Sequence, residues 1–284
     1  MPRYPSCCLL VNPASGSNAA QAVEDVRSAL NGNSVAVSRV VTFPDEPVPT
    51  AQELDREGIP LLVIFTGDGS ANAAISALSG WGGAILVLPG GTMNLLAKRL
   101  HADLSIDDII AIVAGGGALA RRINCAQSRH GIALAGLLAG PGTAWGNVRE
   151  AMRDLDLAGM AQGAVEAMSE TTGGARVTMA SPGIGREDGY PLIEINPGEH
   201  GLQIAGFYAD NAGEYAKQGW ALLRRQFRQG PHDRLGVAES MTISSCDGSD
   251  IGLLLDGEAY SGGPSETFTV APCGVDLLAT AHAN

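Results

Sequence analysis

Two short glycine-containing segments, each placed directly after an apolar run, are the parts of this chain best suited to phosphate chemistry. Leu61–Phe65 leads into Thr66-Gly67-Asp68-Gly69-Ser70, and Ala84–Leu88 leads into Pro89-Gly90-Gly91-Thr92-Met93-Asn94. An uninterrupted apolar run bounded by turn residues is typical of a strand buried on both faces. A glycine turn between such a strand and a helix presents backbone N–H groups and a helix dipole to an anion. Both segments therefore predict contacts to phosphate.

Asp68 is an unusual residue for a phosphate loop, because its carboxylate would repel the ligand. A cation between the two charges would relieve that repulsion, and Mg²⁺ bound to a nucleotide is the usual one. We expect Ser70 to cap a helix over Ala71–Leu78. The alternative for Gly67–Ser70 alone is an ordinary turn with a capping serine. The second glycine loop, in the next strand–helix unit, favours phosphate binding.

A third candidate is Asp256-Gly257-Glu258, which follows the predicted strand Ile251–Leu255. Asp-Gly is a standard hairpin turn, so a purely structural role is the alternative. The functional hypothesis is that a carboxylate here accepts a proton from an attacking hydroxyl.

The elements that must position these loops alternate between strand and helix. The remaining strands are expected at Cys7–Val11 and Val35–Val41, and the remaining helices at Ala19–Leu30, Thr50–Glu57, Leu95–Leu100 and Ile106–Val113. Such alternation favours a parallel sheet covered by helices on both faces, a three-layer α/β domain. Ligands bind outside the carboxyl ends of such strands. We therefore expect four loops to meet at one edge: Asn12–Ser17, Thr42 onward, Thr66–Asn72 and Gly90–Asn94.

The pattern changes after about Arg122, and strands dominate the second part of the chain. They are expected at Ala133–Leu138, Arg176–Ala180, Leu192–Ile195, Leu202–Tyr208, Val237–Cys246, Ile251–Leu255 and Thr267–Val270, with a hairpin turn at Asp247-Gly248 and helical regions over Thr143–Glu170 and Asn211–Gln229. We expect residues 1–122 to form the α/β domain and residues 123–273 to form a mainly antiparallel β domain.

Composition excludes several classes of protein. The 284 residues carry a formal net charge of −12, which would repel nucleic acid. The five cysteines lack the spacing of a zinc site, which favours free thiols in a reducing cytosol. The apolar run before Asn12 is too short for a signal peptide, and the longest apolar tract, Gly131–Gly140, is well below the roughly 20 residues of a membrane span. We expect a cytoplasmic protein.

Taken together, four motifs resemble the diacylglycerol kinase-type lipid kinases, the soluble bacterial branch related to sphingosine and ceramide kinases. They occur in the family's order: Asn12-Pro13-x-Ser15-Gly16, Gly67-Asp68-Gly69-Ser70-x-Asn72, Leu88-Pro89-x-Gly91-Thr92-x-Asn94, and Asp256-Gly257-Glu258. The resemblance implies a two-domain kinase that binds ATP with Mg²⁺ on the α/β domain and a lipid substrate on the second domain. It also implies that the tail, residues 274–284, returns to the first domain.

The resemblance implies roles for individual residues. Glu258 would be the catalytic base, Asp256 would assist it or help to place the metal, and Asp68 would act through the metal. The implied nucleotide-binding residues are Asn12, Thr42, Thr66, Gly67, Asp68, Gly69, Ser70, Asn72, Gly91, Thr92 and Asn94.

The chain departs from the family's pattern at several places. Thr66 replaces the first glycine of the usual Gly-Gly-Asp-Gly-Thr loop and adds a side chain where the backbone would approach phosphate. Ser70 replaces the final threonine and keeps its hydroxyl. Glu199-His200-Gly201-Leu202-Gln203 stands where the family has Asp-Gly-x-Leu-Asp, so we do not expect the structural Mg²⁺ linked to that segment.

One further segment bears on partners. Apolar Trp220, Leu223 and Phe227 recur at helical spacing beside Arg224, Arg225 and Arg228. Such a helix could lie on the anionic inner membrane face. The alternative, which we favour, is a helix packed on the β domain with its arginines in water. A homodimer is compatible with the sequence.

Two other functions stay open. NAD kinase shares the glycine–aspartate loop, although the Pro-Gly-Gly-Thr-Met-Asn loop favours the lipid kinases. A non-catalytic nucleotide- or lipid-binding relative is the second alternative, and the Thr66 replacement keeps it open.

Overall fold

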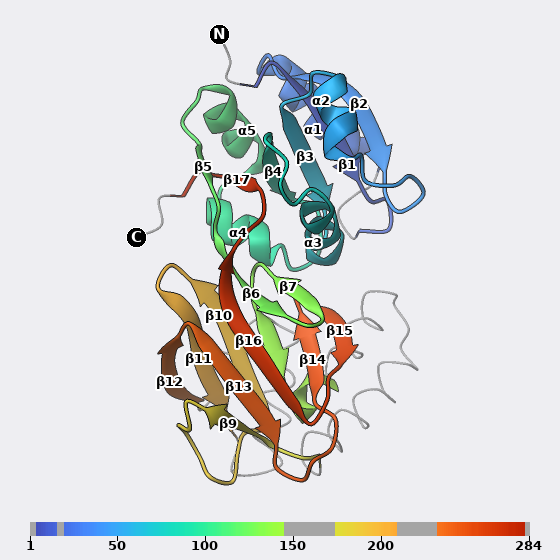
Figure 1. Ribbon diagram of the computed structural model, residues 1–284. Coiled ribbons are helices and arrows are strands. Elements are labelled where there is room, and N and C mark those ends of the chain that lie inside the picture. The colour runs from blue at the N-terminus through green and yellow to red at the C-terminus, as the bar shows by residue number, and fades with distance from the viewer. Residues whose placement is uncertain (1–3, 16–19, 145–173, 209–231, 282–284) are drawn as a thin grey trace. The chain divides into compact units, whose positions relative to one another are not determined.

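The computed structural model describes residues 4–15, 20–144, 174–208 and 232–281 (Figure 1). The chain forms two compact units, Met1–Ile123 with Pro272–Asn284, and Asn124–Ala271. The C-terminal segment therefore belongs to the first unit, where its strand lies within the sheet.

The first unit is built on a six-stranded sheet with the order β2-β1-β3-β4-β17-β5. Its strands are β1 (Ser6–Val11), β2 (Ala36–Thr42), β3 (Leu61–Thr66), β4 (Ala84–Pro89), β17 (Asp276–Ala279) and β5 (Leu119–Arg121). The first five run parallel to their neighbours, and β5 is antiparallel to β17. The predicted α/β fold with a largely parallel sheet is confirmed.

Helices cover this sheet on both faces. They are α1 (Ala20–Gly32), α2 (Ala51–Arg56), α3 (Asp68–Ala77), α4 (Leu95–His101) and α5 (Ile106–Ala114). Helices α1 and α5 share one apolar cluster with alternate strand residues such as Leu9 and Val63. The intervening strand residues, such as Leu10 and Ile64, point to the opposite face of the sheet and are also fully buried. Helix α3 contacts β3, and helix α4 contacts β4. The unit therefore has three layers, with the sheet between two layers of helices.

The start of α3 differs from the expectation. The helix begins at Asp68 with Gly67 at its N-cap, so Ser70 lies inside the first turn and is not the cap. Ser105 does cap α5, and its hydroxyl accepts a hydrogen bond from the backbone N–H of Asp108 at 3.2 Å. The Ser70 hydroxyl instead accepts a hydrogen bond from the Asn12 side chain at 2.9 Å.

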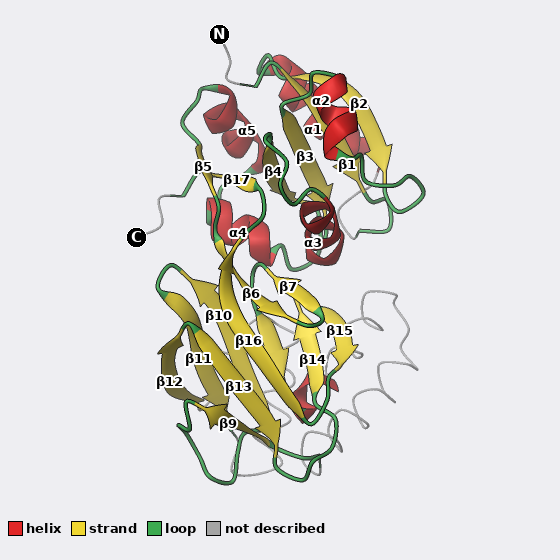
Figure 2. Ribbon diagram, in the orientation of Figure 1, coloured by secondary structure: helices red, strands yellow, loops and turns green. Residues whose placement is uncertain are grey.

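The second unit consists mainly of strands, as Figure 2 shows. One sheet has the order β12-β11-β10-β8-β14-β15 and the other β7-β6-β16-β13-β9. Their bounds are β6 (Asn124–Ser128), β7 (Gly131–Ala133), β8 (Leu137–Ala139), β9 (Val177–Ser181), β10 (Leu192–Gly198), β11 (Gly201–Phe207), β12 (His232–Ala238), β13 (Ser240–Ser245), β14 (Gly252–Leu255), β15 (Glu258–Ser261) and β16 (Ser265–Pro272). Neighbouring strands pair antiparallel, as between β10 and β11 and between β13 and β16. Residues of both sheets share one apolar core that includes Ile195 and Phe268. The predicted antiparallel β domain is confirmed.

Three local predictions in this unit were wrong. Ala133–Leu138 spans the end of β7 and the start of β8, and Val237–Cys246 spans the end of β12 and all of β13. Asp247-Gly248 does not join a hairpin, because β13 and β14 belong to different sheets. Residues 141–144 form a short 3₁₀ helix. The other helical predictions, residues 145–170 and 211–229, lie outside the described residues.

Candidate active site

The sheet register brings the predicted loops of the first unit to one edge. Val11, at the end of β1, pairs with Thr42 of β2 on one side and with Phe65 of β3 on the other. Thr66 in turn pairs with Pro89, the last residue of β4. The segments that follow these strands therefore leave the sheet side by side at its carboxyl edge, where ligands of open α/β sheets bind.

The loop after β1 is hydrogen-bonded to the loop after β3. The Asn12 side-chain amide donates to the Ser70 hydroxyl at 2.9 Å, and the backbone N–H of Gly67 donates to the Ser15 hydroxyl at 3.1 Å. The other side-chain atom of Asn12, its Oδ1, accepts from the backbone N–H of Ala14 at 2.9 Å. The conformations of the two loops are thus set together. Ser15 was part of the sequence motif, but its contact with Gly67 was not predicted.

The loop after β3 is joined to the loop after β4 by Asp68. Its two carboxylate oxygens accept hydrogen bonds from the backbone N–H groups of Leu95 at 3.1 Å and Leu96 at 3.0 Å. These are the first residues of α4, whose N-cap residue Asn94 has a left-handed backbone (φ 54°) and makes no side-chain cap. The Asn94 side chain instead accepts from the backbone N–H of Gly91 at 2.7 Å. Asp68 therefore caps α4 from a neighbouring loop.

This position of Asp68 changes the predicted role of α4. The sequence led us to expect both helix N-termini to face phosphate, with the Asp68 charge balanced by a metal ion. In the structure, the positive end of the α4 dipole already faces the Asp68 carboxylate. The N-terminal turn of α3 is thus the helix terminus at this edge that remains a candidate for phosphate contacts.

The glycines of the two loops allow a close approach that other residues would prevent. A Cβ atom on Gly91 would lie 2.5 Å from the Cα atom of Gly67, and one on Gly90 would lie 2.6 Å from the carbonyl carbon of Phe65. Real Cβ atoms do not come so near to backbone. The Gly90-Gly91 pair is therefore required for the packing of the loop after β4 against the loop after β3.

Thr66 does not have the geometry that the sequence suggested. It is the last residue of β3 and is only 2% exposed. Its hydroxyl donates to the carbonyl of Gly67 at 3.1 Å. The added side chain therefore points into packed protein instead of crowding the outer surface of the loop.

The remaining predicted nucleotide contacts lie near the same edge. Thr42 ends β2, and its backbone N–H donates to the Glu46 carboxylate at 3.2 Å. Asn72 lies in α3, where its side chain accepts from the Ser76 hydroxyl at 3.1 Å. Thr92 is exposed. The structure thus brings all the nucleotide-binding candidates to one edge of one unit, in different local environments.

The second unit carries the Asp256-Gly257-Glu258 motif on a tight hairpin. Leu255 of β14 pairs with Glu258 of β15, which leaves Asp256 and Gly257 as a two-residue turn with φ values of 48° and 95°. Two positive φ values are the mark of a hairpin turn whose twist matches its strands. The hairpin turn predicted at Asp256-Gly257 is therefore present. Glu258 follows the turn and is exposed.

Asp256 is buried and bound to backbone. Its carboxylate accepts hydrogen bonds from the N–H groups of Leu134 at 2.7 Å, Ala135 at 2.8 Å and Gly136 at 3.1 Å. The residue is 5% exposed. It holds the hairpin that carries Glu258 against the β7–β8 connection. Among the described residues, no group of three or more acidic, histidine or cysteine side chains could hold a metal ion.

The predicted membrane-facing residues, Trp220, Arg224, Arg225, Phe227 and Arg228, lie outside the described residues. No helix in the described part of the chain has the length and apolar character needed to cross a membrane.

An α/β unit with glycine loops joined at the carboxyl edge of its sheet, followed by an antiparallel β unit, is a fold found in solved kinase structures. A diacylglycerol kinase from Bacillus anthracis str. Sterne superposes with a TM-score of 0.64 over 98% of both chains at 11% identity. A second structure from this organism, provisionally assigned as a diacylglycerol kinase, has a TM-score of 0.65 at 13% identity and covers 98% of this chain and 96% of its own. Identities this low show a shared fold.

Sequence comparison identifies the first unit further. The diacylglycerol kinase catalytic domain profile matches residues 6–127. No sequence among the curated proteins is significantly similar to this chain. Residues 6–127 thus resemble the diacylglycerol kinase catalytic domain, and the resemblance to this family of lipid kinases is confirmed.

Proposed function

We propose that this protein is an ATP-dependent kinase that transfers the γ-phosphoryl group to the hydroxyl group of a lipid. The observation that carries this proposal is that the matched region, residues 6–127, contains all three loops that the structure joins at one sheet edge. Phosphoryl transfer depends mainly on positioning and on neutralising phosphate charge. Loops that fix one another by hydrogen bonds provide such positioning.

The phosphates of ATP would be held by backbone donors. The first N–H groups of a helix have no acceptor within the helix, and Gly69 and Ser70 lie in the first turn of the ten-residue helix α3. The exposed Thr92 lies in the neighbouring loop. Lys98 and Arg99, on α4, are the cationic side chains of that helix.

Magnesium fits this unit as a partner of the nucleotide and not as a resident metal. Mg²⁺ takes oxygen ligands and keeps several waters, so ATP phosphates and water can supply most of its shell. The Asp68 carboxylate, whose oxygens accept backbone hydrogen bonds, is an oxygen ligand of the kind that Mg²⁺ takes. Asp68 could thus hold the ion from one side, and bound Mg²⁺ would neutralise phosphate charge during transfer.

Glu258 would act as the base. The lipid hydroxyl oxygen would bond to the γ-phosphorus as the bond to the β-phosphate oxygen of ADP breaks, and the hydroxyl proton would pass to the Glu258 carboxylate. An exposed carboxylate on a rigid two-residue hairpin suits this role. Asp256 would position the hairpin through its three backbone hydrogen bonds.

The acceptor class that we propose is a diacylglycerol or a sphingoid-like lipid, met at the inner membrane face by a cytoplasmic enzyme. The test is incubation of the purified protein with γ-labelled ATP, Mg²⁺ and extracted membrane lipids, followed by mass identification of labelled products. Formation of a phosphorylated lipid by the wild-type protein, but not by the Glu258→Gln variant, supports the proposal. Formation of NADP from added NAD would indicate an NAD kinase. ATP binding without transfer to any lipid would indicate a non-catalytic relative.

A further inference from the structure

The segment around the turn between β10 and β11 stands where the resemblance to lipid kinases places residues linked to a structural Mg²⁺. Its sequence is Glu199-His200-Gly201-Leu202-Gln203, and the family pattern is Asp-Gly-x-Leu-Asp. Gly198 pairs with Gly201 across the hairpin, which leaves Glu199 and His200 as a two-residue turn. The atoms that this segment offers as ligands show whether a metal ion fits it.

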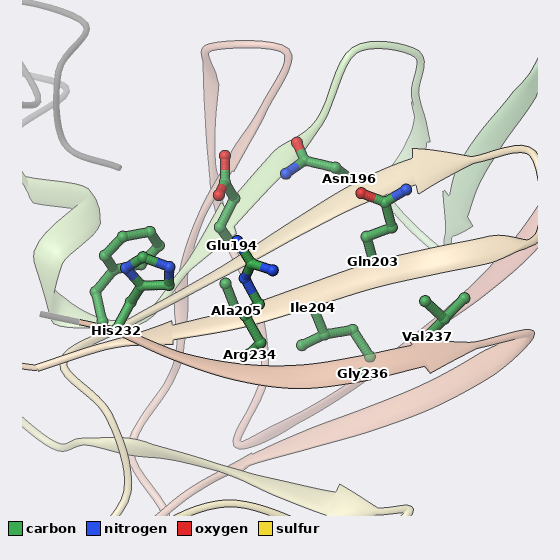
Figure 3. Close-up of a pocket in the computed structure, with 10 residues that line it drawn as sticks. Glu194, Asn196, Gln203, Ile204, Ala205, His232, Arg234, Gly236 and Val237 are labelled. Atoms are coloured by element: carbon green, nitrogen blue, oxygen red, sulfur yellow. The ribbon is translucent and has the colours of Figure 1, made fainter. Parts of the chain in front are cut away.

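The side chains of this segment are a poor set of ligands for Mg²⁺. The ion takes oxygen ligands, and carboxylates are the side chains that usually supply them. Glu199 is the single carboxylate among the five residues, and Gln203 has a neutral amide in place of the second aspartate. Figure 3 shows Gln203 on the same face of the sheet as Asn196, its cross-strand partner on β10. The segment therefore does not fit the metal ion that the resemblance implies.

Backbone carbonyl groups of the turn are instead bound by a side chain from the other sheet. The side-chain nitrogen of Asn124 donates hydrogen bonds to the carbonyl oxygen of Gly198 at 2.8 Å and to that of Glu199 at 3.2 Å. Asn124 is the first residue of β6, and β6 lies in the sheet that does not contain β10 and β11. Its amide group thus cross-links the two sheets of the second unit.

The Asn124 amide supplies the positive charge that a cation would bring to these carbonyl groups. An amide NH2 group has two hydrogens with partial positive charge, enough for one bond to each of the two oxygens. A cation bound by the same pair of oxygens would face these hydrogens and would be repelled. The amide and a metal ion are therefore alternatives at this position.

We propose that the Asn124 amide replaces a structural cation at the β10–β11 turn, so that the second unit folds without a bound metal. Its two sheets are then joined by a link that chelators do not remove and that the concentration of divalent cations does not affect. Together with the proposed function, this means that Mg²⁺ serves ATP and not the fold. The inference itself concerns stability, and its test does not depend on kinase activity.

Thermal unfolding of the full-length protein in EDTA, in Mg²⁺ and in Ca²⁺ tests this inference. Circular dichroism gives the midpoint, and hydrogen exchange in peptides of residues 192–207 assigns any change to the β10–β11 hairpin. Asn124→Ala removes both hydrogen bonds. Asn124→Asp places a carboxylate against the two carbonyl oxygens, an arrangement that favours a cation between them. Gln127→Ala is the control, because Gln127 is an exposed amide residue of the same strand.

We expect the wild-type midpoint to be the same in EDTA and in either cation. Asn124→Ala should lower the midpoint by roughly 2–8 °C in every condition and speed hydrogen exchange in the hairpin, because two hydrogen bonds of a partly buried residue are lost. Gln127→Ala should leave both measurements unchanged. Asn124→Asp should be the least stable variant in EDTA and should regain stability in Ca²⁺, which binds to flexible sets of oxygen ligands.

Three results would overturn the inference. A wild-type midpoint that falls in EDTA, or rises in Mg²⁺ or Ca²⁺, would show that the fold does use a structural metal ion. An Asn124→Ala midpoint equal to that of Gln127→Ala would show that the amide link does not stabilise the unit. Failure of Ca²⁺ to stabilise Asn124→Asp would show that the amide does not lie at a cation position.

Discussion

The carboxylate of Asp68 accepts a hydrogen bond from the backbone N–H of Leu96 at 3.0 Å, although the two residues lie on different strand–helix units of the sheet. A second bond to Leu95 makes the aspartate the cap of α4. One side chain thus connects the two glycine loops that the proposed function assigns to ATP. This contact gives Asp68 a structural role beside any role with the metal.

Asp68→Ala should lower the stability of the first unit. Loss of a capping carboxylate costs about 1–2 kcal/mol in free energy of unfolding, because helix N–H groups lose their acceptor. Urea denaturation followed by hydrogen exchange in α4 peptides measures the change. The control is Asp103→Ala, which removes an exposed aspartate of the same unit. Equal stability of the two variants would contradict the capping role.

Asp68→Asn separates the structural role from the chemical one. The asparagine keeps one acceptor oxygen but removes the charge, so most of the stability should remain. Phosphate transfer should fall by about 100-fold or more if the charge acts through Mg²⁺. Near-normal transfer by this variant would show that Asp68 serves the loop structure alone.

Gly91→Ala should separate the two glycine loops. Its Cβ atom would lie 2.5 Å from the Gly67 Cα atom, and relief of such a contact costs about 1–3 kcal/mol. Because the loop backbones must move, we expect the Kd for ATP, measured by calorimetry, to rise by roughly tenfold. Gly82→Ala is the matched control, since a Cβ atom there meets nothing within 4 Å. If Gly91→Ala bound ATP as tightly as Gly82→Ala, the loop contact would not matter for binding.

Glu258→Gln should remove the base without unfolding the protein. General-base catalysis contributes about 10²- to 10⁴-fold, so kcat for lipid phosphorylation should fall within that range. The thermal midpoint should stay unchanged, because Glu258 is exposed. Glu187→Gln, at another exposed glutamate of the second unit, is the control and should keep its kcat. Turnover by Glu258→Gln equal to that of this control would exclude Glu258 as the base.

Asp256→Ala should act through stability. Three backbone N–H groups would lose their acceptor at a buried position, which we expect to cost about 2–4 kcal/mol in free energy of unfolding. Asp256→Asn should cost less, because asparagine keeps an acceptor and tolerates the left-handed backbone at φ 48°. Denaturant titration of the three proteins tests this order, and equal stabilities of the alanine and wild-type proteins would contradict it.

His101 should make the first unit sensitive to acid. Burial lowers the pKa of this histidine to about 4, and its Nδ1 atom lies 2.9 Å from the Thr280 hydroxyl. The unfolded chain would take up the proton at an ordinary pKa near 6.5, so it binds more protons than the folded protein between those values. The contribution of neutral His101 to stability is therefore fully present above pH 6.5. The free energy of unfolding should fall by about 3 kcal/mol as the pH drops to 4.

Hydrogen exchange of α4 and β17 peptides between pH 4 and 8 measures this loss, after correction for the intrinsic exchange rate. His101→Gln is the matched variant, because glutamine keeps polar atoms but does not titrate in this range. Its stability should vary less across the window. An identical pH dependence in both proteins would place the acid sensitivity elsewhere.

Much of the architecture could be predicted from local sequence. Unbroken apolar runs such as Leu61–Phe65 identify strands that are buried on both faces, because no other arrangement hides every residue of the run. The glycine motifs after Phe65 and Leu88 identified the edge where the loops meet, since carboxyl ends of parallel strands share one side. The resemblance to diacylglycerol kinase-type enzymes rested on the same motifs.

The partners of the polar side chains were decided by tertiary structure alone. The sequence motifs indicated catalytic roles for Asp68 and Asp256, but they did not show that each carboxylate accepts hydrogen bonds from backbone N–H groups far along the chain. Local sequence determines strands and turns because those depend on neighbouring residues. A buried carboxylate instead takes whichever donors the packed chain brings near it, and those donors lie 27 and 122 residues away.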